Sequence, residues 1–387
     1  MKKLLITTIV MAIGFAAFLF GGDKVLAKDI TVEPADTVKP SGNTYSKDYI
    51  RVRNALKEIG EAGGGTLTVK TGHYYISNTL YVGSNTTINF EDDVTFEKLG
   101  GSACSSTMFQ LIPFAQKDAV GVVGKHNGVK NVHFNGKNGT KFDMKNVNIG
   151  KTPAIAIVMG NNSNVSMEYI TFSNIKNGHF IEMDGCKNVY ILRCDFLNMA
   201  DNKYHNKEAI NLDTNDKKTG GFSQKWSKKD KTPNEKVTIQ TCTFSNLVRG
   251  VGTHRYSYGK YHYKILLSTC TFSKVKTPVA MLNWKKSRVG NSYFELSKPN
   301  KRYKYSFLMA GVRGLTFVYN TMSGLKGKPV IKYYKKYQTS HKEYKPTVSK
   351  LSKQNIFDME NNVACDGTKR TFKIGKYKLK WKKKWKK

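Results

Sequence analysis

The chain has 387 residues and a formal net charge of +36 at pH 7, from 64 Lys and Arg against 28 Asp and Glu. This excess is too large to be incidental and predicts attraction to a polyanion. Six cysteines, with no Cys-x-x-Cys pair and no partnered histidine spacing, exclude a conventional zinc module. A basic surface that serves only solubility, or growth in an acidic medium, is the alternative explanation of the charge.

The first 27 residues have the features of an export signal. They start with MKK, continue with an almost unbroken apolar run over residues 4–20, and end with VLA, which allows cleavage before Lys28. An uncleaved membrane anchor is the alternative, but the run is shorter than the ~20 residues of a typical span. We expect a secreted monomer, extracellular or associated with the cell wall, that has no membrane contact after cleavage. Residues 28–45 are expected to form a linker.

Residues 49–59, YIRVRNALKEI, predict an amphipathic helix, and a glycine-rich turn and β-type residues follow from Glu61 to Phe90. This arrangement resembles the opening of the pectin-lyase-like superfamily. The resemblance covers roughly residues 46–320 and implies an all-β fold, a right-handed parallel β-helix whose open end is capped by the helix. It does not imply one reaction, because the superfamily includes lyases, hydrolases, epimerases, esterases and phage adhesins.

A repeat of about 24 residues supports this fold. Six segments align, starting at Asn164, Asn188, Lys236, Tyr263, Arg288 and Gly314. Short β-branched and aromatic runs, broken by Asn, Gly and Lys, predict solenoid coils that stack ~4.8 Å apart. The alignment matches Val289 with Ile265 and predicts an internal ladder of Phe172, Phe196, Phe244, Phe272 and Phe294. The cysteines two residues before three of these are expected to pack in the interior rather than form disulfides or act in catalysis: Cys194, Cys242 and Cys270.

The β-helix is expected to span residues 46–327. Residues 328–387 form a Lys- and Tyr-rich region in which residues 354–367 resemble one last coil. The tail over residues 369–387 has 11 Lys and Arg in 19 residues. Two alternatives stay open for it: a strand that pairs with the end of the helix, or an arm that binds anionic cell-wall polymers.

A cluster of polar side chains is the candidate site. In the segment GHFIEMDG, strand alternation places Glu182 and Asp184 on one face, and in KEAINLDTND it places Asn211 and Asp213 on one face. Each residue of the first pair is 29 residues before its partner in the second, so we expect Glu182 beside Asn211 and Asp184 beside Asp213. We expect this face to point outward along a sugar-binding groove. The next coil, RGVGTHRY, adds the remaining candidates, so that the predicted catalytic residues are Glu182, Asp184, Asp213, His254 and Arg255.

Crowded carboxylates either share a proton or hold a cation, so Asp184 and Asp213 are also candidate Ca²⁺ ligands. His179 and Glu208 start the two acidic strands and are expected to orient the cluster. Candidate substrate-binding residues come from the same strands, from the insertion over residues 214–236, from the basic-aromatic run over residues 255–263 and from the next coil, PVAMLNW: Asn211, Trp226, Tyr256, Tyr258, Asn283 and Trp284. The alternative is that these Asp and Asn residues only end strands and start turns.

The leading functional hypothesis is a lyase that cleaves a uronate polysaccharide by β-elimination, with Ca²⁺ neutralising the carboxylate and His254 or Arg255 as the base. The second is a glycoside hydrolase with paired carboxylates. The motifs of polygalacturonases are not matched, since DTND at residues 213–216 has the wrong order. The third is a non-catalytic adhesin. All three have an acidic polysaccharide as partner, and none expects nucleic acid.

Overall fold

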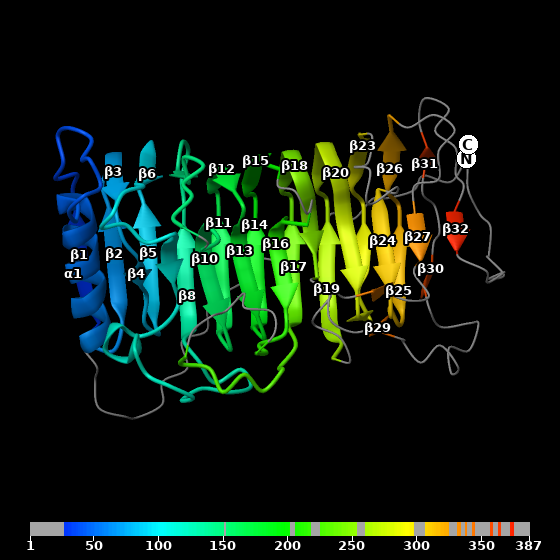
Figure 1. The fold of residues 1–387 in the computed structure, drawn as a ribbon, viewed down its shortest axis with the longest axis horizontal. Coiled ribbons are helices and arrows are strands. Elements are labelled where there is room, and N and C mark those ends of the chain that lie inside the picture. Colours follow the sequence, from blue (N-terminus) through cyan, green and yellow to red (C-terminus); the bar gives the residue numbers. More distant parts are fainter. Residues whose placement is uncertain are drawn as a thin grey trace, which may run out of the picture.

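The structure is a computed structural model. It describes residues 27–150, 152–201, 206–217, 225–253, 260–297, 306–324, 331–333, 337–338, 343–344, 357–358, 363–364 and 372–374. The chain is a right-handed parallel β-helix, as predicted, whose coils stack along the long axis of the molecule with helix α1 (Lys47–Glu61) at one end (Figure 1). The predicted signal lies outside the described residues except for Ala27. No helix within the described ranges is long and apolar enough to cross a membrane.

Each coil contributes up to three strands, which we assign in chain order to faces A, B and C. Face A consists of β1 (Lys28–Val32), β2 (Gly65–Val69), β5 (Thr86–Phe90), β8 (Lys130–Asn135), β11 (Ser163–Glu168), β14 (Lys187–Leu192), β17 (Glu235–Gln240), β19 (His262–Ser268), β21 (Trp284–Lys285), β22 (Arg288–Gly290), β25 (Leu315–Val318) and β30 (Phe357–Asp358). Face B consists of β3 (Gly72–Ile76), β6 (Val94–Lys98), β9 (Lys141–Asp143), β12 (Thr171–Lys176), β15 (Asp195–Ala200), β23 (Tyr293–Leu296), β26 (Thr321–Ser323), β31 (Val363–Ala364) and the first parts of β18 (Thr243–Gly252) and β20 (Thr271–Leu282).

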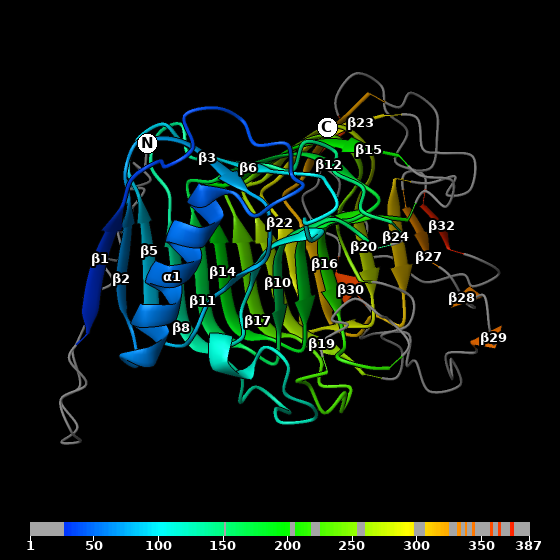
Figure 2. The same ribbon diagram turned by 60° about the vertical axis from the view of Figure 1, so that its left-hand side comes forward.

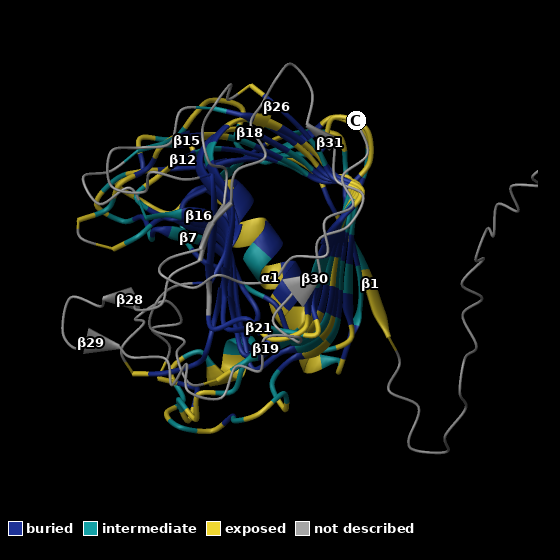
Figure 3. Ribbon diagram, turned by 90° about the vertical axis from the view of Figure 1, so that its right-hand side faces the viewer, coloured by how far each residue is buried: buried dark blue, intermediate teal, exposed yellow. Residues whose placement is uncertain are grey.

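Face C carries the candidate site. It consists of the second parts of β18 and β20 together with β4 (Leu80–Tyr81), β7 (Thr107–Gln110), β10 (Ile155–Gly160), β13 (His179–Asp184), β16 (Glu208–Asp213), β24 (Phe307–Ala310), β27 (Ile331–Tyr333) and β32 (Phe372–Ile374). A short 3₁₀-helix, η1 (Phe114–Gln116), and an antiparallel pair, β28 (Tyr337–Gln338) with β29 (Glu343–Tyr344), lie outside the three faces. Along the axis, the strands enclose a buried interior and the exposed residues concentrate at the turns (Figure 3).

The predicted helix closes the first coil. Ser46 caps it by accepting a hydrogen bond from the Tyr49 backbone N–H at 3.3 Å, and the apolar side of the helix is buried. The helix lies across the open end of the coils (Figure 2). The segment predicted as a linker is partly a strand, because β1 pairs in parallel with β2 from Lys28 opposite Gly65 onward. A Cβ at Gly65 would collide with the carbonyl oxygen of Lys28, so glycine allows the two strands to approach.

The interior ladders are confirmed. Neighbouring rings from Phe172 to Phe294 stack with centroids 5.1, 4.9, 4.5 and 4.8 Å apart, and all are fully buried. Cys194, Cys242 and Cys270 are buried free thiols, and each Sγ lies 3.3 Å from the carbonyl oxygen two residues earlier. The cysteines therefore pack in an interior column, as predicted.

One detail of the predicted register is wrong. Val289 pairs with Leu267 and with Phe317, not with Ile265. Ile265 instead lies beside Ser287, whose hydroxyl accepts its backbone N–H at 3.1 Å. This shift explains why Val289 and Phe294 are only five residues apart, since Leu267 has the same spacing to Phe272.

Several strands of face A start with a left-handed backbone, at their second residue or just before their first. Asn85, Asn131, Asn164 and Asn188 have φ between 53° and 57°, a conformation that asparagine tolerates better than most residues. Their side chains form an asparagine ladder, in which each Nδ2 donates to the Oδ1 of the preceding rung at 2.8, 3.2 and 2.9 Å.

The pairing continues beyond the predicted end at residue 327. Strand β27 extends face C, β30 and β31 pair with β25 and β26, and β32 pairs with β27. Within the segment predicted as a last coil, residues 357–358 and 363–364 therefore pair as strands, and within the basic tail residues 372–374 do. Residues 375–387 lie outside the described part of the chain.

Candidate functional site

The predicted pairing of the acidic strands is confirmed. In β13 and β16, Glu182 lies opposite Asn211, and Asp184 lies opposite Asp213. The Asn211 amide donates to Glu182 Oε1 at 2.9 Å and to Asp213 Oδ2 at 3.2 Å. Oxygen atoms of Glu182, Asp184 and Asp213 all lie within 4.8 Å of one another. We call these four residues the carboxylate cluster.

The carboxylate cluster is not on an open surface, which corrects the expected exposure. Glu182 and Asp184 are 0% exposed, and Asn211 and Asp213 are 2% exposed. The strand ends around them are tied to the insertion, because the Asn234 amide donates to the carbonyl oxygens of Met183 and Asp213 at 3.0 Å each. A polysaccharide cannot reach the carboxylates in this arrangement.

Trp226 was expected to lie over sugar rings and is instead a packing residue. It is 3% exposed, and its indole N–H donates to Gln116 Oε1 at 2.9 Å. Its backbone oxygen accepts from Val122 and Val123 at 2.7 and 3.0 Å, so the insertion docks on the segment that follows η1. The described part of the insertion is held in place by these contacts.

Trp284 is likewise unavailable to a ligand. It is 0% exposed, and its indole N–H donates to Thr253 Oγ1 at 2.7 Å. Asn283 is buried with φ of 57°, and its carbonyl oxygen accepts the backbone N–H of His262 at 2.9 Å. Both residues shape the turn between faces C and A.

His179 and Glu208 lie directly beside the carboxylate cluster. The His179 Nε2 is 3.5 Å from Glu182 Oε2, and its Nδ1 is 2.7 Å from the Glu208 carbonyl oxygen. The Glu208 carboxylate in turn accepts a hydrogen bond from the buried Arg249 guanidinium at 2.6 Å. This geometry is compatible with the predicted orienting role, which remains a prediction.

Burial changes the proton affinity of the carboxylate cluster. It raises the pKa of Glu182 to about 7, although nearby Lys207 and the Asn211 hydrogen bond oppose the shift. Burial raises the pKa of Asp184 well above its usual range, and the neighbouring Glu182 and Asp213 add to the effect. At least one of these groups therefore holds a proton at neutral pH.

The oxygens of the carboxylate cluster form a set that a hard cation such as Ca²⁺ prefers. Neither side-chain oxygen of Asp184 accepts a hydrogen bond from an N–H or hydroxyl donor among the described residues. Asn211, however, turns its N–H₂ group toward the carboxylates rather than its oxygen. Glu182, Asp184 and Asp213 would thus be the cation ligands.

Four predicted site residues lie outside the described residues: His254, Arg255, Tyr256 and Tyr258. The chain enters this segment next to the carboxylate cluster, because Asn211 pairs with Gly252 in β18, two residues before His254. Their predicted roles stay predictions.

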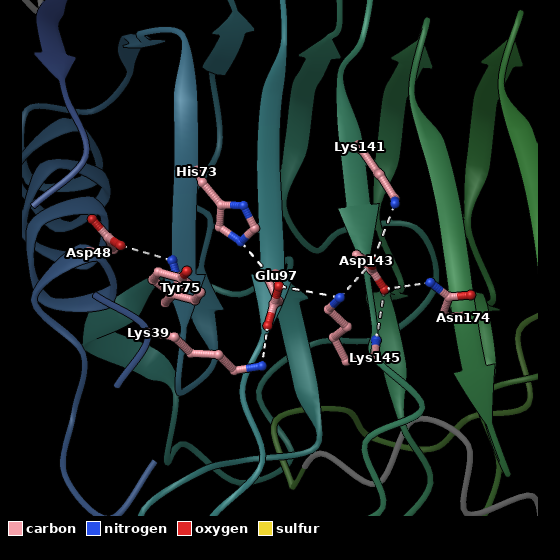
Figure 4. Close-up of polar contacts among 9 residues, drawn as sticks. All are labelled: Lys39, Asp48, His73, Tyr75, Glu97, Lys141, Asp143, Lys145 and Asn174. Atoms are coloured by element: carbon pink, nitrogen blue, oxygen red, sulfur yellow. Dashed lines mark hydrogen bonds and ion pairs between the residues drawn. The ribbon is translucent and has the colours of Figure 1, made fainter. Parts of the chain in front are cut away.

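Sequence reasoning did not find a second buried acidic group, on face B. Glu97 lies opposite Asp143, and both are buried. His73 Nε2 is 3.1 Å and Lys39 Nζ is 2.6 Å from Glu97, while Lys145 reaches both carboxylates (Figure 4). Strand alternation alone could have placed the two acids together, but no repeat aligns them in the sequence. The lysine side chains balance the charge of these two buried carboxylates.

Together these clusters make the outer surface more basic than the composition suggests. Among the described residues, eight acidic side chains are buried but only two basic ones, Lys98 and Arg249. The buried acids are Asp48, Glu97, Asp143, Glu182, Asp184, Glu208, Asp213 and Asp216. The positive charge is thus concentrated where a partner can meet it.

No family model matches the sequence. Plasmin and fibronectin-binding protein A of Streptococcus pneumoniae is 27% identical over 258 residues, which are 60% of this chain and 35% of that protein. The chain therefore spans about a third of the length of this curated relative. A solved structure of the S. pneumoniae surface protein and adhesin PfbA has a TM-score of 0.56 at 18% identity, covering 76% of this chain and 86% of that one. ORF18 of Geobacillus virus E2 has a TM-score of 0.50 at 12% identity, covering 87% of this chain and 60% of that one. At these identities, the similarity to the solved structures shows a shared fold.

Proposed function

We propose that this chain is a bacterial surface or secreted protein that binds an acidic polysaccharide, as an adhesin does, through its basic outer surface. The observation that carries the proposal is the unequal burial of charge: among the described residues, eight acidic side chains are buried but only two basic ones, in a chain with a net charge of +36. The similarity to a protein described as a surface adhesin supports a surface location. Within the β-helix proteins, we propose the pectin-lyase-like superfamily as the closest grouping, based on the helix-capped, glycine-rich opening.

Binding should depend on the carboxylates of the polysaccharide. We expect the full chain to bind a linear polyuronate and to bind its carboxyl-reduced, neutral form far more weakly, because Lys side chains recognise the charge. Calorimetry with the two polymers measures this directly. Equal binding of both forms would contradict the proposal.

A second candidate function is catalysis at the carboxylate cluster, favoured by the raised pKa of Glu182 and Asp184. In a lyase, Ca²⁺ held by Glu182, Asp184 and Asp213 would neutralise the uronate, with His254 or Arg255 as base. In a hydrolase, two of the carboxyl groups would act as acid and nucleophile. Either reaction requires the residues that bury the carboxylate cluster to move, because the cluster is at most 2% exposed. Binding is therefore our first proposal.

Turnover separates these candidates. A lyase produces unsaturated products that absorb near ~235 nm, whereas a hydrolase produces new reducing ends without that absorbance. If either signal appears and Asp184→Asn lowers it by about 10² or more, the cluster is catalytic. Binding without either signal supports the adhesin.

A further inference from the structure

A row of lysines continues the asparagine ladder. Lys236, Lys264 and Lys286 follow Asn188 on successive coils, as the pairing of β14, β17, β19 and β21 shows. Their φ angles of 55°, 56° and 48° match the left-handed conformation of the asparagines. All three side chains are exposed. One cation therefore stands on each rung, at the ~4.8 Å spacing of neighbouring strands.

The residues directly before these lysines also lie above one another on successive coils, and most of them are basic or aromatic. This column runs from Lys187 through Glu235, Tyr263 and Lys285 to Arg313. Glu235 is the one acidic residue in these two columns among the described residues, and it lies 3.3 Å from Lys187. We call the following residues of the two columns the basic edge: Lys236, Lys264, Lys285, Lys286 and Arg313.

Aromatic rings hold the cations of the basic edge in place. The Nζ atoms of Lys264 and Lys286 lie 5.4 and 5.8 Å from the centre of the Tyr263 ring. The Arg313 guanidinium lies 4.9 Å from the centre of the Tyr261 ring. Such cation–π contacts limit the motion of long side chains, so that less entropy is lost when an anion binds.

We infer that the basic edge is the docking surface for a linear acidic polysaccharide that carries one carboxylate per sugar and lies along the solenoid axis. This inference rests on the proposed function and names its binding surface. A straight single row of cations suits an extended polymer with regularly spaced single charges. Duplex DNA fits less well, because it presents a charge every ~1.7 Å of its axis on two winding strands.

The structure offers a conservative way to remove these charges. In the triple variant K236N/K264N/K286N, each new asparagine occupies the position and φ that Asn131, Asn164 and Asn188 already have. The ladder of amide hydrogen bonds can then extend, so the variant should unfold at the same temperature as the wild type or higher. We expect its dissociation constant for the polyuronate to rise roughly tenfold or more.

A matched control removes the same charge at the same backbone conformation elsewhere. Lys125, Lys231 and Lys274 are exposed and have φ of 53°, 61° and 53°, but they do not form a row on successive rungs. K125N/K231N/K274N should change the affinity by less than about twofold. Equal losses in the two triple variants would overturn the inference in favour of net charge alone.

The remaining outcomes are also decisive. Unchanged affinity in K236N/K264N/K286N would overturn the inference while leaving the proposed function intact. Absence of wild-type binding to the polyuronate would instead overturn the proposed function. Tighter binding of single-stranded DNA than of the polyuronate, lost in the same triple variant, would refute the assigned partner.

Discussion

The wild-type protein should lose stability as the pH rises from about 4.5 to about 7, and replacing Glu182 by Gln should reduce this loss. The pKa of this carboxyl is 4.5 ordinarily and about 7 in the folded chain. Between these values the folded state binds more protons than the unfolded state, so the free energy of unfolding decreases with increasing pH. The expected decrease is on the order of 3 kcal/mol. Gln keeps an acceptor for the Asn211 amide but carries no charge.

Urea unfolding at acidic and mildly alkaline pH, in the presence of a chelator, measures this effect. Asp184→Asn should act in the same direction, because burial and the neighbouring carboxylates also raise the pKa of Asp184. The exposed Asp92→Asn is the control and should leave the pH profile unchanged. A wild-type protein that becomes more stable across this range would contradict the account of the carboxylate cluster. Restoration of stability by Ca²⁺ at alkaline pH, in the wild type but not in the variants, would support a cation site there.

Phe244→Ala should lower the free energy of unfolding by about 3–5 kcal/mol. The Phe244 ring is fully buried between Phe196 and Phe272, with centroids 4.9 and 4.5 Å away. Truncation leaves a cavity in the middle of the stack, where neighbouring coils cannot collapse without breaking strand pairing. Urea unfolding monitored by circular dichroism provides the measurement.

Thr238→Ala is the matched control for this prediction. Thr238 lies on the neighbouring strand β17 and is partly exposed, so its replacement should cost less than about 0.5 kcal/mol. A loss below about 1 kcal/mol for Phe244→Ala would mean that the aromatic ladder does not stabilise the solenoid.

Much of the fold was predictable because equivalent residues of successive coils pair directly. The apolar positions Val165, Val189, Val237 and Ile265 align in the structure as they do in the sequence. The alignment failed at Val289, where the coil is shorter and local spacing no longer identifies the partner. Strand β1 was missed because five residues with little pattern form a strand only through pairing with a segment 37 residues away.

The site was predictable only in part. Alternation along a strand correctly placed Glu182 and Asp184 beside Asn211 and Asp213. It could not reveal their burial, because that depends on contacts between distant segments, such as the hydrogen bond from Asn234 to the Met183 carbonyl oxygen across 51 residues. For the same reason, Trp226 was predicted to stack on sugar rings, because it is an aromatic residue in a lysine-rich insertion. In the structure it is buried and packs against the segment that contains Gln116.

The central claim is that exposed positive charge binds an acidic polysaccharide, and its most direct test is the salt dependence of that binding. The affinity of the full chain for a polyuronate should be measured from about 0.1 M to about 1 M salt, over which the Debye length falls from ~10 Å to ~3 Å. The account predicts a steep loss of affinity across this range and a shallower dependence for K236N/K264N/K286N. Binding that does not change with salt would contradict it.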